Sequence, residues 1–162
     1  MKKVLLGLGT NLGKKEQNLN HAIDMVKKEI GAVQAISSIY QTPPWGFESK
    51  EYFFNQVIAV QTVLTPSELM IAIKNIESTM GRLQREQGQG YQDRIIDLDI
   101  LDYAGEVMDL EHVTIPHPKM SERSFVLLPL QEVDQFWVHP TSKMSILDLI
   151  NTLKNDIEIK KI

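Results

Sequence analysis

The stretch Ile95-Ile96-Asp97-Leu98-Asp99-Ile100-Leu101 sets two aspartates into an otherwise aliphatic run. Such a run is typical of a buried β-strand, and its five aliphatic residues favour a central place in the sheet. Alternate residues of a strand share a face, so Asp97 and Asp99 project together with Cα atoms about 6.6 Å apart. Two carboxylates so placed can share a divalent cation or hold two cations about 4 Å apart. A strand with one solvated face is the alternative interpretation.

Apolar periodicity around this strand predicts alternating strands and helices. Strands are expected at residues 4–9, 35–40, 54–63 and 95–103. One amphipathic helix is expected over residues 16–30. A second is expected to begin at Pro66, within the capping box Thr65-Pro66-Ser67-Glu68, and to end at Gly81. The order β-α-β-β-α-β predicts an α+β fold: a ferredoxin-like sandwich with a mainly antiparallel sheet and helices on one face.

C-terminal additions follow this unit. A short helix is expected over residues 121–128, limited by Pro129, and a last helix begins after the cap residue Ser145. Because no repeat or linker-like segment interrupts the chain, we expect one domain spanning residues 1–162.

Composition narrows the classes of function. Lys and Arg total 17 against 21 Asp and Glu, a formal net charge of -4, which argues against a protein that coats nucleic acid or an anionic membrane. The chain has no Cys, which excludes disulfides, thiolate zinc sites and cysteine nucleophiles. The apolar start breaks at Thr10-Asn11, so it indicates a first strand and no signal peptide. We expect a cytoplasmic monomer that binds neither nucleic acid nor membrane.

The chain has only four arginines, and three of them bracket the aspartate strand. Arg82 and Arg85 leave the second helix, and Arg94 enters the strand. The connection between them, residues 82–94, is long for a compact domain, and such loops are usually functional or disordered. Guanidinium groups bind phosphate oxygens bidentately, so arginines beside paired carboxylates indicate phosphoryl transfer. Solvated surface charge is the alternative.

Three further segments carry weaker signals. The segment Gly7-Leu8-Gly9-Thr10-Asn11-Leu12-Gly13 fits neither a dinucleotide fingerprint nor a P-loop, so we interpret it as a strand-to-helix turn. Thr42-Pro43-Pro44-Trp45-Gly46, with Phe53 and Asn55, suits a flat heterocycle, although aromatics near a turn are more often core. His117 has no second ligand at zinc spacing, but beside Arg123 it could donate to phosphate.

Taken together, these segments resemble the 6-hydroxymethyl-7,8-dihydropterin pyrophosphokinase family of folate biosynthesis. The resemblance covers nearly the whole chain. It rests on Leu8-Gly9-Thr10-Asn11-Leu12-Gly13, Tyr40-Gln41-Thr42-Pro43-Pro44 with Asn55, Glu77 with Gly81-Arg82, Arg94-Ile95-Ile96-Asp97-Leu98-Asp99-Ile100, Thr114-Ile115-Pro116-His117-Pro118, and Glu122-Arg123-Ser124-Phe125-Val126-Leu127-Leu128-Pro129-Leu130.

The resemblance implies transfer of pyrophosphate from ATP, the co-substrate, to the hydroxymethyl oxygen of the pterin, with release of AMP. It implies two Mg²⁺ ions on Asp97 and Asp99, and catalytic roles for Arg82 and Arg94 in a mobile loop that closes over the phosphates. The pterin would contact Thr42, Pro43, Trp45, Phe53, Asn55 and Phe125. The nucleotide would contact Glu77, Arg85, Tyr91, Ile100, Thr114, His117 and Arg123.

The chain departs from the family pattern around the nucleotide. Gln84 stands where an arginine is usual, with Arg85 next to it, and Tyr91-Gln92-Asp93 replaces the usual Trp-Gly-Pro. His112 replaces a further arginine. These changes make the nucleotide site less cationic and predict a stronger dependence on metal ions.

Two other interpretations stay open. A ferredoxin-like module for RNA or a regulatory ligand would carry aromatics on central strands and a basic sheet face. A degenerate family member would bind pterin or ATP without turnover.

Overall fold

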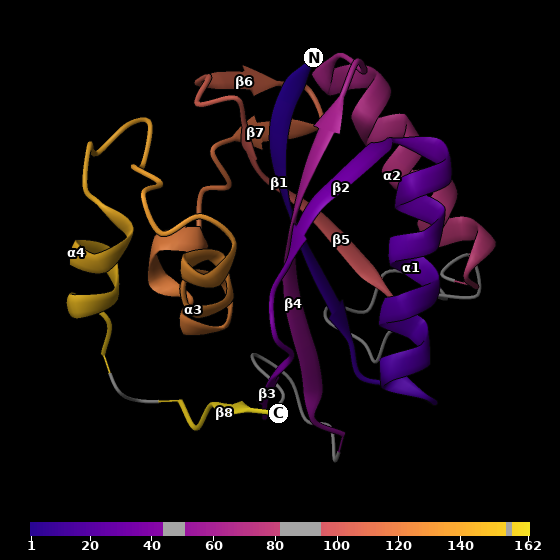
Figure 1. Cartoon of the computed structure of the whole chain (residues 1–162), viewed down its shortest axis with the longest axis horizontal. Helices are drawn as coiled ribbons and strands as arrows, with labels where there is room; N and C mark the ends of the chain where they lie inside the picture. The colour runs from indigo at the N-terminus through magenta and orange to yellow at the C-terminus, as the bar shows by residue number, and fades with distance from the viewer. Residues whose placement is uncertain (44–50, 82–94, 155–156) are drawn as a thin grey trace.

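The computed structural model describes residues 1–43, 51–81, 95–154 and 157–162. In these residues one antiparallel sheet forms the centre of the molecule (Figure 1). Its strand order is β5-β1-β4-β3-β8, and β2 pairs with β4 next to β3. The strands are β1 (Lys2–Thr10), β2 (Gly31–Ile36), β3 (Tyr40–Thr42), β4 (Phe53–Thr62), β5 (Asp97–Tyr103) and β8 (Lys160–Lys161).

Helices cover both faces of this sheet (Figure 1). α1 (Lys15–Glu29) and α2 (Pro66–Thr79) lie on one face, where their apolar stripes pack on β1, β4 and β5. α3 (Ser124–Val133) and α4 (Ile146–Asn151) lie on the other, with a second apolar cluster beneath them. The predicted α+β, ferredoxin-like sandwich is confirmed, and the C-terminal additions supply the third layer.

Local signals in the sequence account for the ends of several elements. The predicted capping box of α2 is present: the Glu68 amide donates to Thr65 Oγ1 at 3.3 Å, and the Thr65 amide donates to Glu68 Oε2 at 2.8 Å. The Ser145 hydroxyl caps α4 by accepting from the Asp148 amide at 3.1 Å. These bonds satisfy amide groups that the first turn of a helix leaves without partners.

The prediction that the aspartate strand is central is wrong, because among the described residues β5 is at the edge of the sheet, with β1 as its one neighbouring strand. Its aliphatic residues are buried because α2 covers one face and the α3 layer the other. Hydrogen bonds from other segments also cover part of the outer edge of β5. The Leu98 amide donates to Glu77 Oε1 at 3.0 Å, and the His117 amide donates to the Leu101 carbonyl at 3.0 Å. Such cover protects an edge strand from pairing with another chain.

Two boundaries also differ from the prediction. The strand expected at 35–40 is divided into the end of β2 and the start of β3, because residues 37–39 leave the ladder between them. Pro129 does not end the helix that contains it but lies inside α3. Pro129 is buried among apolar neighbours, so tertiary packing outweighs the loss of one helical hydrogen bond.

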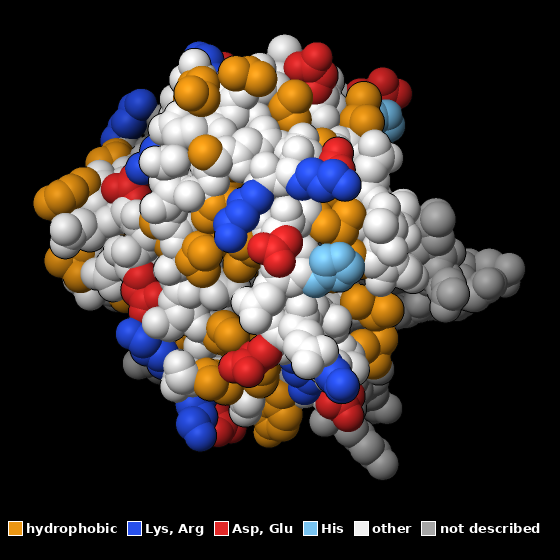
Figure 2. Space-filling model, turned by 45° about the vertical axis from the view of Figure 1, so that its right-hand side comes forward, with side chains coloured by type: hydrophobic (Ala, Val, Ile, Leu, Met, Phe, Trp, Pro, Cys, Tyr) orange, Lys and Arg blue, Asp and Glu red, His pale blue; other side chains and the backbone are white. Residues whose placement is uncertain are grey.

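Two further strands, β6 (Met108–Leu110) and β7 (Val113–Ile115), form a separate hairpin that the sequence did not predict. Figure 2 shows Lys and Arg side chains scattered among Asp and Glu on the face in view, with no continuous basic patch among the residues drawn there in colour. Among the described residues, no helix combines the length and apolar character that a membrane span requires.

Candidate functional site

The paired aspartates lie on the face of the sheet that α3 covers, which we call the α3 face. Leu98 and Ile100 belong to the apolar cluster beneath α1 and α2. Because side chains alternate along a strand, Asp97 and Asp99 point to the opposite side. Both are partly exposed, whereas their aliphatic neighbours are buried. The pair therefore has access to solvent on the α3 face, as a site for a hydrated cation requires.

The register of the central strands aligns this pair with the residues expected to bind the pterin. Asp97 is opposite Gly9 of β1, and Gly9 is opposite Asn55 of β4. Asn55 is in turn opposite Tyr40 of β3. Neighbouring strands are about 4.8 Å apart, so the backbones of Asn55 and Asp97 are separated by about 10 Å. A single row across the sheet thus joins two groups of residues that are far apart in the sequence.

Glycine occupies the middle of this row and of the next one. Gly9 lies between Asn55 and Asp97, and Gly7 lies between Val57 and Asp99. A Cβ atom at Gly9 would lie 3.8 Å from Asn55 Oδ1, which is an ordinary contact. The backbone therefore does not require glycine at this position. The Leu101 side chain lies 3.5 Å from the place that a Cβ atom of Gly7 would take, whereas Asn55 Oδ1 is the one described atom near such a Cβ atom at Gly9. We call this space above Gly9, between Asp97 and Asn55, the glycine gap.

Hydrogen bonds fix the orientation of the Asn55 side chain. Asn55 Nδ2 donates to the Tyr40 carbonyl at 3.1 Å and to Thr42 Oγ1 at 2.9 Å. Both amide protons are therefore committed to β3, and the carbonyl oxygen Oδ1 is the polar atom on the side of Gly9. Asn55 is buried, so this orientation is held firmly. The side chain presents an acceptor to a ligand in the glycine gap.

His117 and Arg123 lie at the aspartate end of the row. Burial, together with the positive charge of Arg123, lowers the pKa of His117 to about 4, although the nearby Asp97 carboxylate acts in the opposite direction. The imidazole is therefore neutral at pH 7. Its Nδ1 accepts from the Lys119 amide at 3.2 Å, which leaves the proton on Nε2. His117 can thus donate one hydrogen bond to a phosphate oxygen without adding a charge.

The aromatic residues of the expected pterin site also lie on the α3 face. Phe53 follows the alternation of Asn55 on β4, and Phe125 lies in the first turn of α3. Both rings are half-buried. The Arg123 guanidinium lies 5.6 Å from the centre of the Phe125 ring, so one turn contributes both a cation and a flat apolar surface.

The remaining predicted residues divide into three groups. Glu77 is buried under β5 and binds its Leu98 amide, and Ile100 is buried in β5 itself. Thr114 is exposed on β7, where its hydroxyl donates to Asp109 Oδ1 at 2.9 Å, and Pro43 directly follows β3. The predictions for Trp45, Arg82, Arg85, Tyr91 and Arg94, and the departures at Gln84 and Asp93, lie outside the described residues.

Reasoning from the sequence missed two features of this site. The sequence alone places Gly7 and Gly9 in a strand-to-helix turn, although glycine in an apolar strand is itself a signal that a ligand or another group approaches the backbone closely. Glu132 of α3 was not singled out at all. Its contacts with β3 depend on the third layer, which periodicity could not place.

The chain is similar to proteins of one known family. Residues 5–135 match the family model described as 7,8-dihydro-6-hydroxymethylpterin-pyrophosphokinase. The chain is 40% identical over 139 residues to a 2-amino-4-hydroxy-6-hydroxymethyldihydropteridine pyrophosphokinase of Porphyromonas gingivalis, covering 85% of this chain and 93% of that protein. It is 35% identical over 156 residues to the protein of the same name from Aquifex aeolicus, covering 95% of each.

Solved structures share the fold. A crystal structure of HPPK-DHPS in complex with substrates superposes with a TM-score of 0.74 at 16% identity, over 93% of this chain and 43% of that one. The wild-type HPPK-DHPS of Plasmodium falciparum superposes with a TM-score of 0.73 at 19% identity, over 93% of this chain and 43% of that one. The chain thus spans less than half of these longer proteins. On the match of residues 5–135 and the identity to full-length relatives, the chain belongs to the 7,8-dihydro-6-hydroxymethylpterin-pyrophosphokinase family, the pyrophosphokinases of folate biosynthesis.

Proposed function

We propose that this chain transfers the β- and γ-phosphates of ATP as one unit to 6-hydroxymethyl-7,8-dihydropterin across the glycine gap. The hydroxymethyl oxygen attacks the β-phosphorus and loses its proton. The bond from the β-phosphorus to the oxygen that bridges it to the α-phosphate breaks, and AMP leaves. The observation that supports the proposal is the row Asn55, Gly9 and Asp97, which sets a heterocycle acceptor and a carboxylate about 10 Å apart with glycine between them in the described part of the chain.

The aspartates suit Mg²⁺. This ion is usually held by one or two carboxylates, with water and substrate phosphates completing its octahedron. Asp97 and Asp99 supply two such carboxylates on one face, and the described residues contain no cluster of three or more acidic, His or Cys side chains that would hold a metal without substrate. We propose that Asp97 and Asp99 hold two Mg²⁺ ions together with ATP. An ion held by these carboxylates would supply positive charge to neutralise the phosphates and polarise the reacting phosphorus.

Residues at the aspartate end orient the nucleotide. Neutral His117 donates from Nε2 to a phosphate oxygen, and Arg123 supplies a fixed positive charge beside it. We assign Glu77, Ile100 and Thr114 to the same half of the site. Glu77 binds the Leu98 amide of β5, Ile100 lies in β5, and Thr114 lies on β7, which packs against β5. From the sequence we assign Arg85 and Tyr91 to nucleotide binding as well, and Arg82 and Arg94 to stabilising charge in the transition state. These four assignments rest on the sequence alone.

Residues at the other end hold the pterin. Asn55 Oδ1 accepts from the pterin ring, because both of its amide protons are committed to β3. Thr42 and Pro43 contribute backbone groups, and Phe53 and Phe125 offer flat surfaces for stacking. Trp45 is assigned to this end from the sequence. With its ring held there, the hydroxymethyl arm points over Gly9 toward the phosphates.

Product analysis tests this function. The protein is mixed with MgATP and 6-hydroxymethyl-7,8-dihydropterin, and the products are identified by mass spectrometry. AMP and the pterin diphosphate are expected in equal amounts. ADP with a pterin monophosphate would place the attack at the γ-phosphorus, and bound substrates without products would identify a non-catalytic binder.

We further propose that the enzyme works as a cytoplasmic monomer and does not bind nucleic acid. One copy of the chain supplies both ends of the row, so the reaction needs no residue from a second copy. The net charge of -4 opposes binding to a polyanion. Sedimentation velocity should give a single species of the mass of one chain, 18.5 kDa, and a gel shift at low salt should leave RNA unbound.

A further inference from the structure

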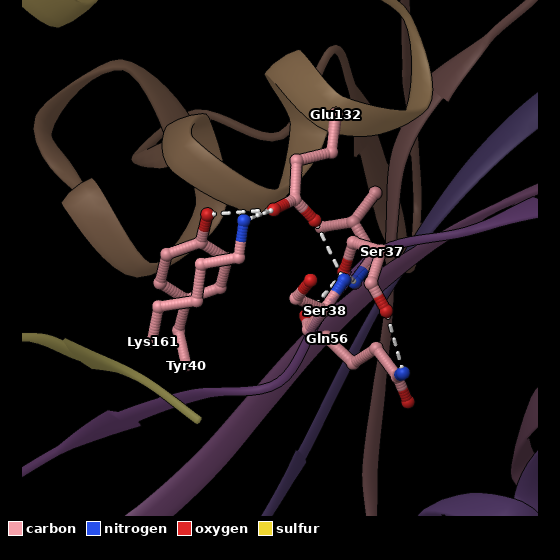
Figure 3. Close-up of polar contacts among 7 residues, drawn as sticks. Ser37, Ser38, Tyr40, Gln56, Glu132 and Lys161 are labelled. Atoms are coloured by element: carbon pink, nitrogen blue, oxygen red, sulfur yellow. Dashed lines mark hydrogen bonds and ion pairs between the residues drawn. The ribbon is translucent and has the colours of Figure 1, made fainter.

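One carboxylate of α3 joins three segments that meet at the pterin end of the sheet (Figure 3). Glu132 Oε2 accepts from the Ser38 amide at 2.6 Å. Glu132 Oε1 accepts from the Tyr40 hydroxyl at 3.0 Å and pairs with Lys161 Nζ at 2.7 Å. The segments are the connection from β2 to β3, the strand β3 and the strand β8. We call these residues, Ser38, Tyr40, Glu132 and Lys161, the Glu132 cluster.

The protonation states of Glu132 and Tyr40 decide which group donates in these contacts. Burial would raise the pKa of Glu132, but the bonds from Lys161, Ser38 and Tyr40 outweigh that effect and lower it, so the carboxylate stays ionised. Burial and the bond to Glu132 raise the pKa of Tyr40 to about 12, so the phenol keeps its proton and donates. A charged acceptor makes hydrogen bonds roughly twice as strong as a neutral one does.

The strand that this cluster holds, β3, is short and lies between the start of β4 and β8. β3 has three residues, Tyr40–Thr42, and its outer neighbour β8 has two. Ladder bonds alone give a strand of this length little stability. The connection before β3 is tied separately to β4, because the Val57 amide donates to Ser37 Oγ at 3.0 Å and Gln56 Nε2 donates to the Ser37 carbonyl at 2.8 Å (Figure 3).

We propose that Glu132 is a positioning residue for pterin recognition: it holds β3 against α3 so that Tyr40 and Thr42 keep Asn55 in its binding orientation. The chain of contacts is direct. Glu132 binds the Tyr40 hydroxyl, and the Tyr40 carbonyl and Thr42 Oγ1 accept both amide protons of Asn55. If β3 moves, Asn55 loses both partners and is free to turn its amide. This inference rests on the proposed function for the identity of the ligand.

The test measures both substrates separately in the full-length protein. Glu132→Ala removes the whole cluster, Tyr40→Phe removes one bond, and Glu132→Gln keeps acceptor oxygen without charge. Asp134→Asn is the matched control, because Asp134 is two residues away, at the C-terminal end of α3, and pairs with Lys3 instead of β3. Calorimetry gives the Kd of a non-hydrolysable ATP analogue with Mg²⁺, and then the Kd of the pterin at saturating analogue.

The Kd of the pterin should rise about tenfold in Glu132→Ala, since a site that is ordered one tenth of the time binds tenfold more weakly. We expect about threefold in Tyr40→Phe, an intermediate value in Glu132→Gln and no change in Asp134→Asn. The Kd of the nucleotide should stay within twofold throughout. An unchanged pterin Kd, or equal changes for both ligands, would overturn the proposal. If Glu132→Ala does not fold, Tyr40→Phe decides by the same criteria.

Hydrogen exchange in the ligand-free protein separates this inference from the proposed function. Glu132→Ala and Tyr40→Phe should speed exchange of the β3 amides that bond to β4, while the amides of β1 keep their wild-type protection. Unchanged protection of β3 would refute the positioning role even if the protein binds pterin. If exchange of β3 is faster in the two variants but the wild-type protein binds no pterin, the contact is supported and the proposed function is refuted.

Discussion

Gly9→Ala should leave the fold intact and remove most of the activity. The added Cβ atom meets only Asn55 Oδ1, at 3.8 Å, among the described residues, so nothing has to move. The backbone of Gly9 does not lie in the left-handed region, and a Gly-to-Ala change at such a position stabilises a protein by about 0.4–1 kcal/mol. The free energy of unfolding should therefore stay level or rise.

The same methyl group projects into the glycine gap. A ligand that rests on the Cα atom must rise by about the length of one carbon–carbon bond, roughly 1.5 Å. A displacement of about 1 Å at the reacting atoms can cost about 100-fold in rate, which corresponds to about 2.7 kcal/mol. We expect kcat/KM to fall about 100-fold when AMP formation is measured under steady-state conditions.

Gly31→Ala provides the contrast. A Cβ atom at Gly31 would lie 2.0 Å from the Gln61 carbonyl oxygen in the adjoining strand β4, so β2 and β4 must separate. We expect a loss of at least about 2 kcal/mol in urea unfolding followed by circular dichroism. A Gly9→Ala protein that unfolds as readily as Gly31→Ala, or that turns over within threefold of the wild type, would refute the argument from the glycine gap.

Three further predictions address individual side chains. Asp97→Asn and Asp99→Asn should each keep the fold and lower AMP formation by about 1,000-fold, since metal-ion stabilisation supplies several kcal/mol; near-normal rates in both would remove the metal role. Glu77→Leu leaves the buried Leu98 amide without its acceptor and should lower the free energy of unfolding, measured in urea, by about 1–3 kcal/mol. Glu77→Gln keeps an acceptor and should lower it less. Equal losses in the two variants would contradict this reasoning. The folded-state pKa of His117, about 4, is below its unfolded value of about 6.5, so the free energy of unfolding should fall as the pH drops from 6.5 to 4, by up to about 3 kcal/mol. When unfolding is measured in the presence of EDTA, His117→Asn should show a shallower fall with pH. A pH profile identical to that of the wild type would exclude His117 as the cause.

Much of the fold was predictable from short-range signals. The period of the apolar residues located α1 and α2, and the capping residues Thr65 and Ser145 marked where α2 and α4 begin. The order of elements then indicated the ferredoxin-like sheet. These signals are local because helix caps and amphipathic stripes depend on residues a few positions apart.

The place of β5 in the sheet and the course of α3 depend on the third layer, and local signals could not predict them. The aliphatic run of β5 indicates burial on two faces, and a central strand is the usual way to achieve it. Here α3 supplies the second cover, so the strand is buried at the edge of the sheet. Pro129 inside α3 has the same origin, since contacts with distant residues outweigh a local preference.

The candidate site shows the same division. Asp97, Asp99 and Asn55 could be chosen from residue type and spacing, and the register of the strands then brings them into one row. The glycine gap and the Glu132 cluster were missed because each depends on what lies across the sheet. The loop arginines lie outside the described residues, so their roles stay predictions.

The sheet has a consequence for how the protein can evolve. Its apolar core beneath α1 and α2 is separated by the strands from the face that carries Asn55, Asp97 and Asp99. Substitutions in that core can change thermal tolerance while the face proposed for the reaction stays as it is. Substitutions beneath α3 alter the support of that face, so the two sides should drift at unequal rates. Stabilising variants are therefore best sought among residues such as Ala22 and Ile73, on the side away from the proposed reaction.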